Sequence, residues 1–106
     1  MVAPTYRLTN QALRDLDDIA EYLRERSPSA AIRTLDTLRS TFQLLAANPQ
    51  MGTARDDLHL GLRAFTPQRP AAHYIVFFTA IPEGVLVTDI MHGARNWEAL
   101  FLGRER

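Results

Sequence analysis

The sequence contains no cysteine and no lysine. The absence of cysteine excludes disulfides, thiolate metal sites and redox chemistry at thiols. The absence of lysine excludes a lysine nucleophile and a Schiff base, and all twelve basic residues are therefore arginine. No apolar run approaches the length of a membrane span, and the N-terminal residues lack the basic and apolar regions of a secretion signal. We therefore expect a cytoplasmic protein.

The chain also lacks a net charge, because twelve acidic residues balance the twelve arginines. A domain that binds nucleic acid by neutralising many phosphates carries a strong positive field, so this balance argues against that class. With 46% hydrophobic and 23% charged residues, the composition is that of a folded globular protein. The length of 106 residues suits one domain, which we expect to span residues 1–106.

The N-terminal part carries the pattern of a short strand followed by a helix. Thr5–Leu8 favours the strand, and Thr9 or Asn10 can cap the helix. That helix has an apolar stripe at helical spacing, formed by Ala12, Leu13, Leu16, Ile19, Ala20 and Leu23. Its carboxylates fall outside the stripe. No loop or glycine gives them the curved geometry of a cation site, so we expect a solvated face at Asp15, Asp17, Asp18 and Glu21.

A second helix follows directly. Ser27–Ser29 combines a capping serine with a proline that is tolerated at a first helical position, so it ends one helix and starts the next. The apolar stripe of the second helix consists of Ala31, Leu35, Leu38, Phe42 and Leu45. The two helices are predicted to form an antiparallel hairpin that ends at Asn48–Gly52. Leu44 lies off the stripe, where it is a candidate contact for a partner.

Three strand-like runs come next, and their spacing predicts antiparallel neighbours: Leu62–Thr66, His73–Thr79 and Val85–Met91. The middle run is apolar on both faces, which is typical of a central strand with one face on the helical hairpin. The other face then needs a cover, either the C-terminal segment or a partner. The predicted fold class is α+β, in the order β-α-α-β-β-β, with a helical hairpin on a small antiparallel sheet and a short C-terminal helix.

Polar chemistry gathers where the last predicted strand ends. The run His92–Asn96 brings a histidine, a glycine, an arginine and an asparagine directly after Val85–Met91. This pattern indicates a strand that ends at a functional edge and turns into a short helix.

The order of elements, together with three motifs, resembles a known superfamily. The motifs are the acidic first helix at Ala12–Ile19, the strand Leu62–Phe65 ahead of the apolar run Tyr74–Phe78, and the ending His92–Asn96. In this order they resemble the RelE/ParE superfamily of type II toxin-antitoxin toxins, more closely its ParE branch, over nearly the whole chain. One departure is the link Pro67–Ala72, which is longer than the tight turn that the family often has there.

The resemblance implies a small toxin that is held inactive by a cognate ParD-like antitoxin. Superfamily members similar to RelE cut messenger RNA in the ribosomal A site, and members similar to ParE block DNA gyrase by protein contact. The resemblance implies no cofactor, no metal and no membrane partner, and no DNA binding by the toxin without its antitoxin. A further alternative is a non-toxic component that still binds an antitoxin.

Residue chemistry favours gyrase over messenger RNA as the target. A metal-free nuclease needs groups that move protons and cations that hold the phosphate charge, and the candidates are Arg63, Tyr74, His92 and Arg95. Strand alternation places His73 and Tyr74 on opposite faces, so at most one of them joins a given site. The zero net charge also argues against entry into a phosphate-lined site.

The choice of gyrase as the target leads to a set of expected contacts. The expected target-binding residues are Arg63, Arg69, His92 and Arg95, and the expected antitoxin-binding residues are Leu44, Trp97, Leu100 and Phe101. Purely structural roles are the alternative for several of them. His92 would then bond to backbone, Arg63 would pair with Asp89 across the sheet, and Trp97, Leu100 and Phe101 would pack on the sheet as core.

Overall fold

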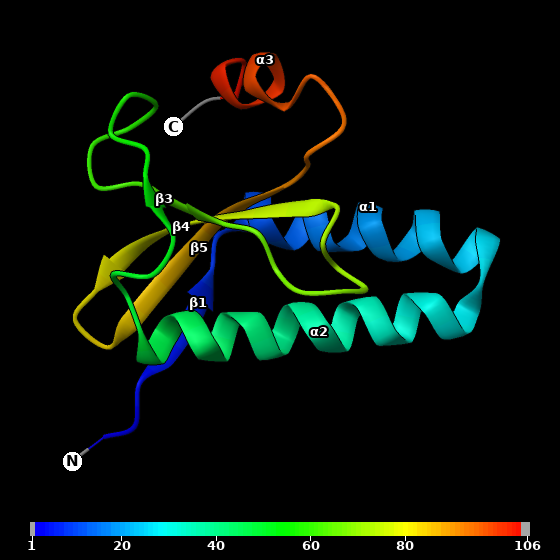
Figure 1. Ribbon diagram of the computed structural model, residues 1–106, viewed down its shortest axis with the longest axis horizontal. Coiled ribbons are helices and arrows are strands. Elements are labelled where there is room, and N and C mark those ends of the chain that lie inside the picture. Colours follow the sequence, from blue (N-terminus) through cyan, green and yellow to red (C-terminus); the bar gives the residue numbers. More distant parts are fainter. Residues whose placement is uncertain (1, 105–106) are drawn as a thin grey trace.

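The computed structural model describes residues 2–104 and contains three helices and five strands in that range. Figure 1 shows a helical hairpin on one side of a small sheet and a short helix on the other. The elements are β1 (Thr5–Leu8), α1 (Asn10–Arg26), α2 (Pro28–Ala47), β2 (Thr53–Ala54), β3 (Arg63–Phe65), β4 (Tyr74–Ile81), β5 (Gly84–His92) and α3 (Trp97–Leu102). The α+β fold class is confirmed, and the two-residue strand β2 is an addition to it.

The sheet has the strand order β1-β5-β4-β3-β2. Strands β2 to β5 pair antiparallel, as expected. Strand β1 instead runs parallel to β5, so the sheet is mixed and the prediction of a fully antiparallel sheet is wrong in this detail. The physical reason is that parallel neighbours need a long connection, and two helices and three strands separate β1 from β5.

Side-chain hydroxyl groups cap the N-termini of α1 and α2. Thr9 caps α1, since its Oγ1 accepts the Ala12 amide at 3.1 Å, and the same hydroxyl donates to the Thr88 carbonyl of β5 at 2.8 Å. Ser27 caps α2 by accepting the Ala30 amide at 3.3 Å, while its own amide closes the last turn of α1. The predicted caps are therefore confirmed, and one of them also ties the helix to the sheet.

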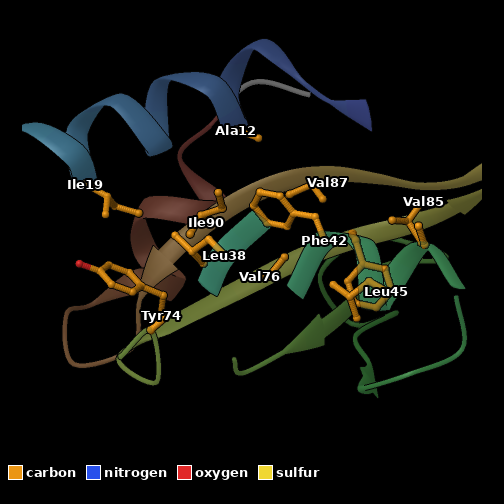
Figure 2. Close-up of a cluster of buried hydrophobic side chains, with 13 residues drawn as sticks. Ala12, Ile19, Leu38, Phe42, Leu45, Tyr74, Val76, Val85, Val87 and Ile90 are labelled. Carbon is orange, nitrogen blue, oxygen red and sulfur yellow. The ribbon is translucent and has the colours of Figure 1, made fainter. Parts of the chain in front are cut away.

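The hairpin buries its apolar stripe on one face of the sheet (Figure 2). The cluster joins residues of both helices to the inward side chains of β4 and β5: Ala12, Ile19, Leu38, Phe42, Leu45, Tyr74, Val76, Val85, Val87 and Ile90. Two predictions on α1 fail. Leu13 is 46% exposed rather than in the stripe, and Asp15 is only 5% exposed rather than solvated.

The C-terminal segment covers the other face. Phe77 of β4 contacts Trp97 and Phe101 of α3, with ring centroids 5.2 and 5.1 Å apart. Met91 and Leu62 complete this second cluster. Of the two predicted covers for this face, the C-terminal segment is the one present. Leu100 does not join it and is 56% exposed. No helix within residues 2–104 has the length and apolarity needed to cross a bilayer.

Candidate functional site

A pocket of about 390 Å³ opens at one end of the hydrophobic cluster between the helical hairpin and the sheet. Strand β5 ends there, β4 begins there, and α1 and the C-terminal segment form the remaining walls. Figure 2 shows Tyr74 at this end of the cluster, close to Ile19 and with its hydroxyl pointing away from the other side chains. The polar and aromatic lining consists of Asp15, Asp18, Tyr22, Tyr74, His92, Arg95 and Arg104.

Two aromatic rings flank the His92 imidazole. Tyr74 lies directly opposite His92 across the β4–β5 pair, with ring centroids 5.4 Å apart and ring planes nearly perpendicular. The His73 ring stacks parallel to His92 at 6.0 Å. Only Tyr74 lines the pocket, as alternation predicts, yet both rings lie next to His92 because His73 sits in the turn before β4.

Both ring groups in the pocket are uncharged at neutral pH. Burial lowers the pKa of His92 below its ordinary value of 6.5, and the charges of Arg95 and His73 add to this effect. Burial also raises the pKa of Tyr74, with Tyr22 adding to the shift and Arg95 opposing it. The site therefore presents a neutral imidazole and a neutral phenol, which donate and accept hydrogen bonds without carrying charge.

Arg95 lies at the mouth of the pocket and is exposed. Its guanidinium carbon is 5.9 Å from the centroid of the Tyr22 ring, and that of Arg26 is 3.7 Å from the same ring. Such contacts are cation–π interactions, strongest where water is excluded. Arg95 and His92 are thus two predicted target contacts that the fold does bring together.

A buried ion-pair network forms the floor of the pocket. Arg104, after α3, donates to Asp15 at 2.8 and 2.9 Å and to Asp89 at 2.8 Å. Asp15 also accepts the Ile90 amide at 2.9 Å, so this side chain links α1 to β5 and to the C-terminal segment. Burial alone would lower the pKa of Arg104, but hydrogen bonds and charges from both aspartates raise it overall. Sequence reasoning missed this network, since no local pattern joins residues so far apart.

Arg63 lies outside the pocket. Its guanidinium donates to the carbonyls of Gln50, Met51 and Gly52 at 2.7 to 3.1 Å, which holds the segment after α2 against β3. The suggested pairing of Arg63 with Asp89 is wrong, because Arg63 lies opposite Phe78 and Asp89 is engaged by Arg104.

Arg69 is exposed in the loop between β3 and β4 and does not line the pocket either. Of the four nuclease candidates, the structure therefore groups Tyr74, His92 and Arg95 and places Arg63 elsewhere.

The expected antitoxin contacts differ in accessibility. Leu44 on α2 and Leu100 on α3 are 44% and 56% exposed. Trp97 is half-buried and Phe101 is buried in the second cluster. Within residues 2–104, no three histidine, aspartate or glutamate side chains are grouped so that they could hold a metal ion.

Comparisons with known proteins agree on one superfamily. The family model described as "ParE toxin of type II toxin-antitoxin system, parDE" matches residues 6–97. Toxin ParE1 of Caulobacter vibrioides is 30% identical over 95 residues, which cover 89% of this chain and 94% of that protein. Toxin RelE3 of the same organism is 28% identical over 82 residues, which cover 77% of this chain and 86% of that protein.

A solved structure shares the fold. A chain of the "Chromosomal ParDE TA system from P. aeruginosa" superposes with a TM-score of 0.68 at 20% identity, covering 84% of this chain and 95% of that chain. At that identity the likeness concerns the fold. The family match extends over most of the sequence, from β1 to the start of α3. The chain therefore belongs to the ParE toxin family of type II toxin-antitoxin systems, within the RelE/ParE superfamily.

Proposed function

We propose that residues 1–106 form one cytoplasmic toxin domain that inhibits DNA gyrase by protein contact and is neutralised by a ParD-like antitoxin. In this proposal the pocket lined by Tyr22, Tyr74, His92 and Arg95 is the centre of the target-binding surface. Arg63 and Arg69 lie outside the pocket, so we assign them to its periphery, where they contribute less than Arg95.

The observation that carries the proposal is the charge of the pocket. Of its two arginines, Arg104 is bound by two aspartates, which leaves Arg95 as the accessible cation of the lining. The carboxylate of Asp18 lines the same pocket, and His92 is neutral at pH 7. A site that stabilises the charge developing on a phosphate needs several converging cations. A mixed polar and aromatic pocket with one exposed guanidinium is better suited to a protein surface.

The second candidate function is a ribosome-dependent endoribonuclease similar to RelE. The juxtaposition of Tyr74, His92 and Arg95 in one pocket favours it, as does the likeness to Toxin RelE3. Against it stand the engagement of Arg63 by backbone carbonyls and the raised pKa of Tyr74, which makes this phenol a poor base at neutral pH.

The antitoxin is proposed to cover exposed apolar side chains at two separate places, one at the pocket and one on α2. Leu100 lines the pocket and is largely exposed, and Leu44 is exposed on α2. Trp97 and Phe101 pack α3 on the sheet and would thereby position Leu100 for the antitoxin. The solved relative belongs to a ParDE system, which fits an antitoxin of that type.

Inducible expression without an antitoxin tests the proposal, followed by two assays on the same toxin. The first measures supercoiling by purified gyrase, and the second maps messenger cleavage on ribosomes by primer extension. We expect inhibited supercoiling with intact messenger. Codon-specific cuts with normal supercoiling would support the nuclease, and normal growth with neither effect would support a non-toxic antitoxin-binding protein.

A further inference from the structure

Two histidines satisfy three consecutive backbone amides in the connector between β5 and α3. The Gly93 amide donates to the His73 carbonyl at 2.7 Å, and the Arg95 amide donates to the His92 carbonyl at 3.2 Å. Between them, the Ala94 amide donates to the imidazole Nδ1 of His92 at 3.2 Å. His92 therefore supplies two of the three acceptors, one from its backbone and one from its side chain.

The hydrogen bond from Ala94 requires one chemical form of His92. A neutral imidazole has one acceptor nitrogen and one donor nitrogen, whereas the imidazolium has two donors and no acceptor. Because Nδ1 accepts, the neutral ring carries its proton on Nε2. A second proton, on Nδ1, would face the N–H of Ala94, and the turn would lose this bond. Only the neutral ring is compatible with the observed turn.

The turn sets the position of Arg95. Its amide is held by His92, and its carbonyl accepts the Trp97 amide at 2.7 Å. The backbone of Arg95 is thus fixed on both sides, with the guanidinium near Tyr22 at the mouth of the pocket.

We propose that His92 is a positioning residue, whose Nδ1 closes the 92–94 turn and thereby holds Arg95 where it contacts the target. This inference rests on the proposed function, because it assigns a role within the same binding surface. It predicts that target binding requires the neutral imidazole and weakens as His92 takes up a proton. In this role the imidazole acts through Arg95.

The surroundings of the imidazole support a transition on the acid side of neutral pH. The titratable or charged groups that line the pocket with it come from α1, β4, the connector and the C-terminal segment: Asp15, Asp18, Tyr22, Tyr74, Arg95 and Arg104. His73 stacks on it from the turn before β4. Asp15 is paired with Arg104, and burial together with Arg95 and His73 lowers the pKa of His92.

The lowered pKa of His92 determines the direction in which pH changes the stability of the fold. The folded-state pKa of His92 lies below the unfolded value of 6.5, so between the two values the unfolded chain binds more protons. The stabilising contribution of the neutral ring is present above the unfolded value and is lost as the pH falls through the folded value. Placement of Arg95 should be lost in the same direction.

Two substitutions separate positioning from a merely structural role. In His92→Asn the side-chain oxygen can accept the amide two residues on, as in an Asx turn, and this group does not titrate near neutral pH. In His92→Ala no side-chain acceptor remains. The asparagine variant is therefore the matched control for the hydrogen bond without the proton.

The first readout is inhibition of gyrase supercoiling from about pH 8 to about pH 5. We expect wild-type inhibition to weaken about tenfold one pH unit below the pKa of His92, where about a tenth of the rings are neutral. Inhibition by His92→Asn, whatever its strength at pH 8, should stay constant across the range, which also controls for the pH response of gyrase, and His92→Ala should be weak throughout. A pH profile of His92→Asn that follows the wild type, or full inhibition by His92→Ala, would overturn the proposal.

The second readout does not depend on gyrase. Nitrogen-15 NMR of the free toxin should show an unprotonated Nδ1 in neutral His92, and the amides of Ala94 and Arg95 should titrate with the imidazole in the wild type alone. A proton on Nδ1 in the neutral ring, or amides that do not respond, would refute the positioning role. If the wild type and both variants fail to inhibit gyrase at every pH, while the amides of the wild type still titrate with the imidazole, gyrase is refuted as the target and the positioning role is not.

Discussion

Arg104 holds both carboxylate oxygens of Asp15, with its Nη2 2.8 Å from Oδ1 and its Nη1 2.9 Å from Oδ2. This two-point contact joins the second turn of α1 to a residue 89 positions later in the chain. Bidentate arginine–carboxylate pairs are stronger and more directional than single contacts. The C-terminal segment is therefore anchored by charge at one end and by the rings of α3 at the other.

Arg104→Ala should destabilise the fold by about 3 kcal/mol, because Asp15 would stay buried without its guanidinium. Urea unfolding measures this change. Arg39→Ala is the matched control, since Arg39 pairs with Asp36 on the exposed side of α2, where a pair contributes about 0.5 kcal/mol. Equal losses in the two variants would contradict the role assigned to the buried network.

Gly84→Ala should prevent the normal pairing of β1 with β5. Gly84 has a φ of 153°, and a Cβ there would lie 1.8 Å from the Thr5 carbonyl oxygen. We expect a loss of about 3 kcal/mol in the free energy of unfolding, measured by thermal or urea denaturation. Gly61→Ala, at a φ of 82° with no atom within 4 Å of the added carbon, should cost about 1 kcal/mol. A smaller loss at Gly84 than at Gly61 would argue against the close approach of β1.

Phe101→Ala should loosen α3 from the sheet, because this ring is buried against Phe77. The expected loss is about 3–4 kcal/mol. Trp97, the single tryptophan, reports the change directly, since its fluorescence should shift toward that of an exposed indole. Leu100→Ala removes an exposed side chain of the same helix and should leave both stability and fluorescence near wild type. Unchanged fluorescence in Phe101→Ala would show that α3 is held by other contacts.

Arg95→Ala should mainly weaken inhibition, and Arg63→Ala should mainly lower stability. Arg95 is exposed at the pocket, so its removal should weaken gyrase inhibition about tenfold or more with stability within about 0.5 kcal/mol. Arg63 holds three backbone carbonyls, so its removal should cost about 2 kcal/mol of stability and reduce inhibition less. Supercoiling assays and urea unfolding on both proteins check this. Arg69→Ala should affect inhibition less than Arg95→Ala, and the reverse order would move the binding surface to the β3–β4 loop.

The elements of the fold were readable from the sequence because their signals are local. The capping residues Thr9 and Ser27 lie where predicted, and the three β-rich runs became β3, β4 and β5. The neighbour of β1 was not readable. Alternating side chains identify a strand, but they do not say which of several distant strands it joins or in which direction.

The candidate site was only partly readable for the same reason. His92 and Arg95 are three positions apart, so their joint place at the pocket follows from the local sequence. Asp15 was expected in solvent because it falls outside the apolar stripe of its helix, and its burial depends on a counter-charge that only the folded chain supplies. The engagement of Arg63 by carbonyls likewise has no sequence pattern, since any three backbone groups in a loop could provide it.

The parallel pairing of β1 with β5 also bears on how the chain is made. Residues 5–8 leave the ribosome before residues 84–87 and find their partners only when those residues have emerged. The charge of Asp15 is then matched only after residue 104. Because such distant contacts must form before the sheet closes, this domain remains incompletely folded in a nascent chain until residue 104 has emerged. The pocket at the end of β5 is thus completed only after Arg104, which lines it, has been translated.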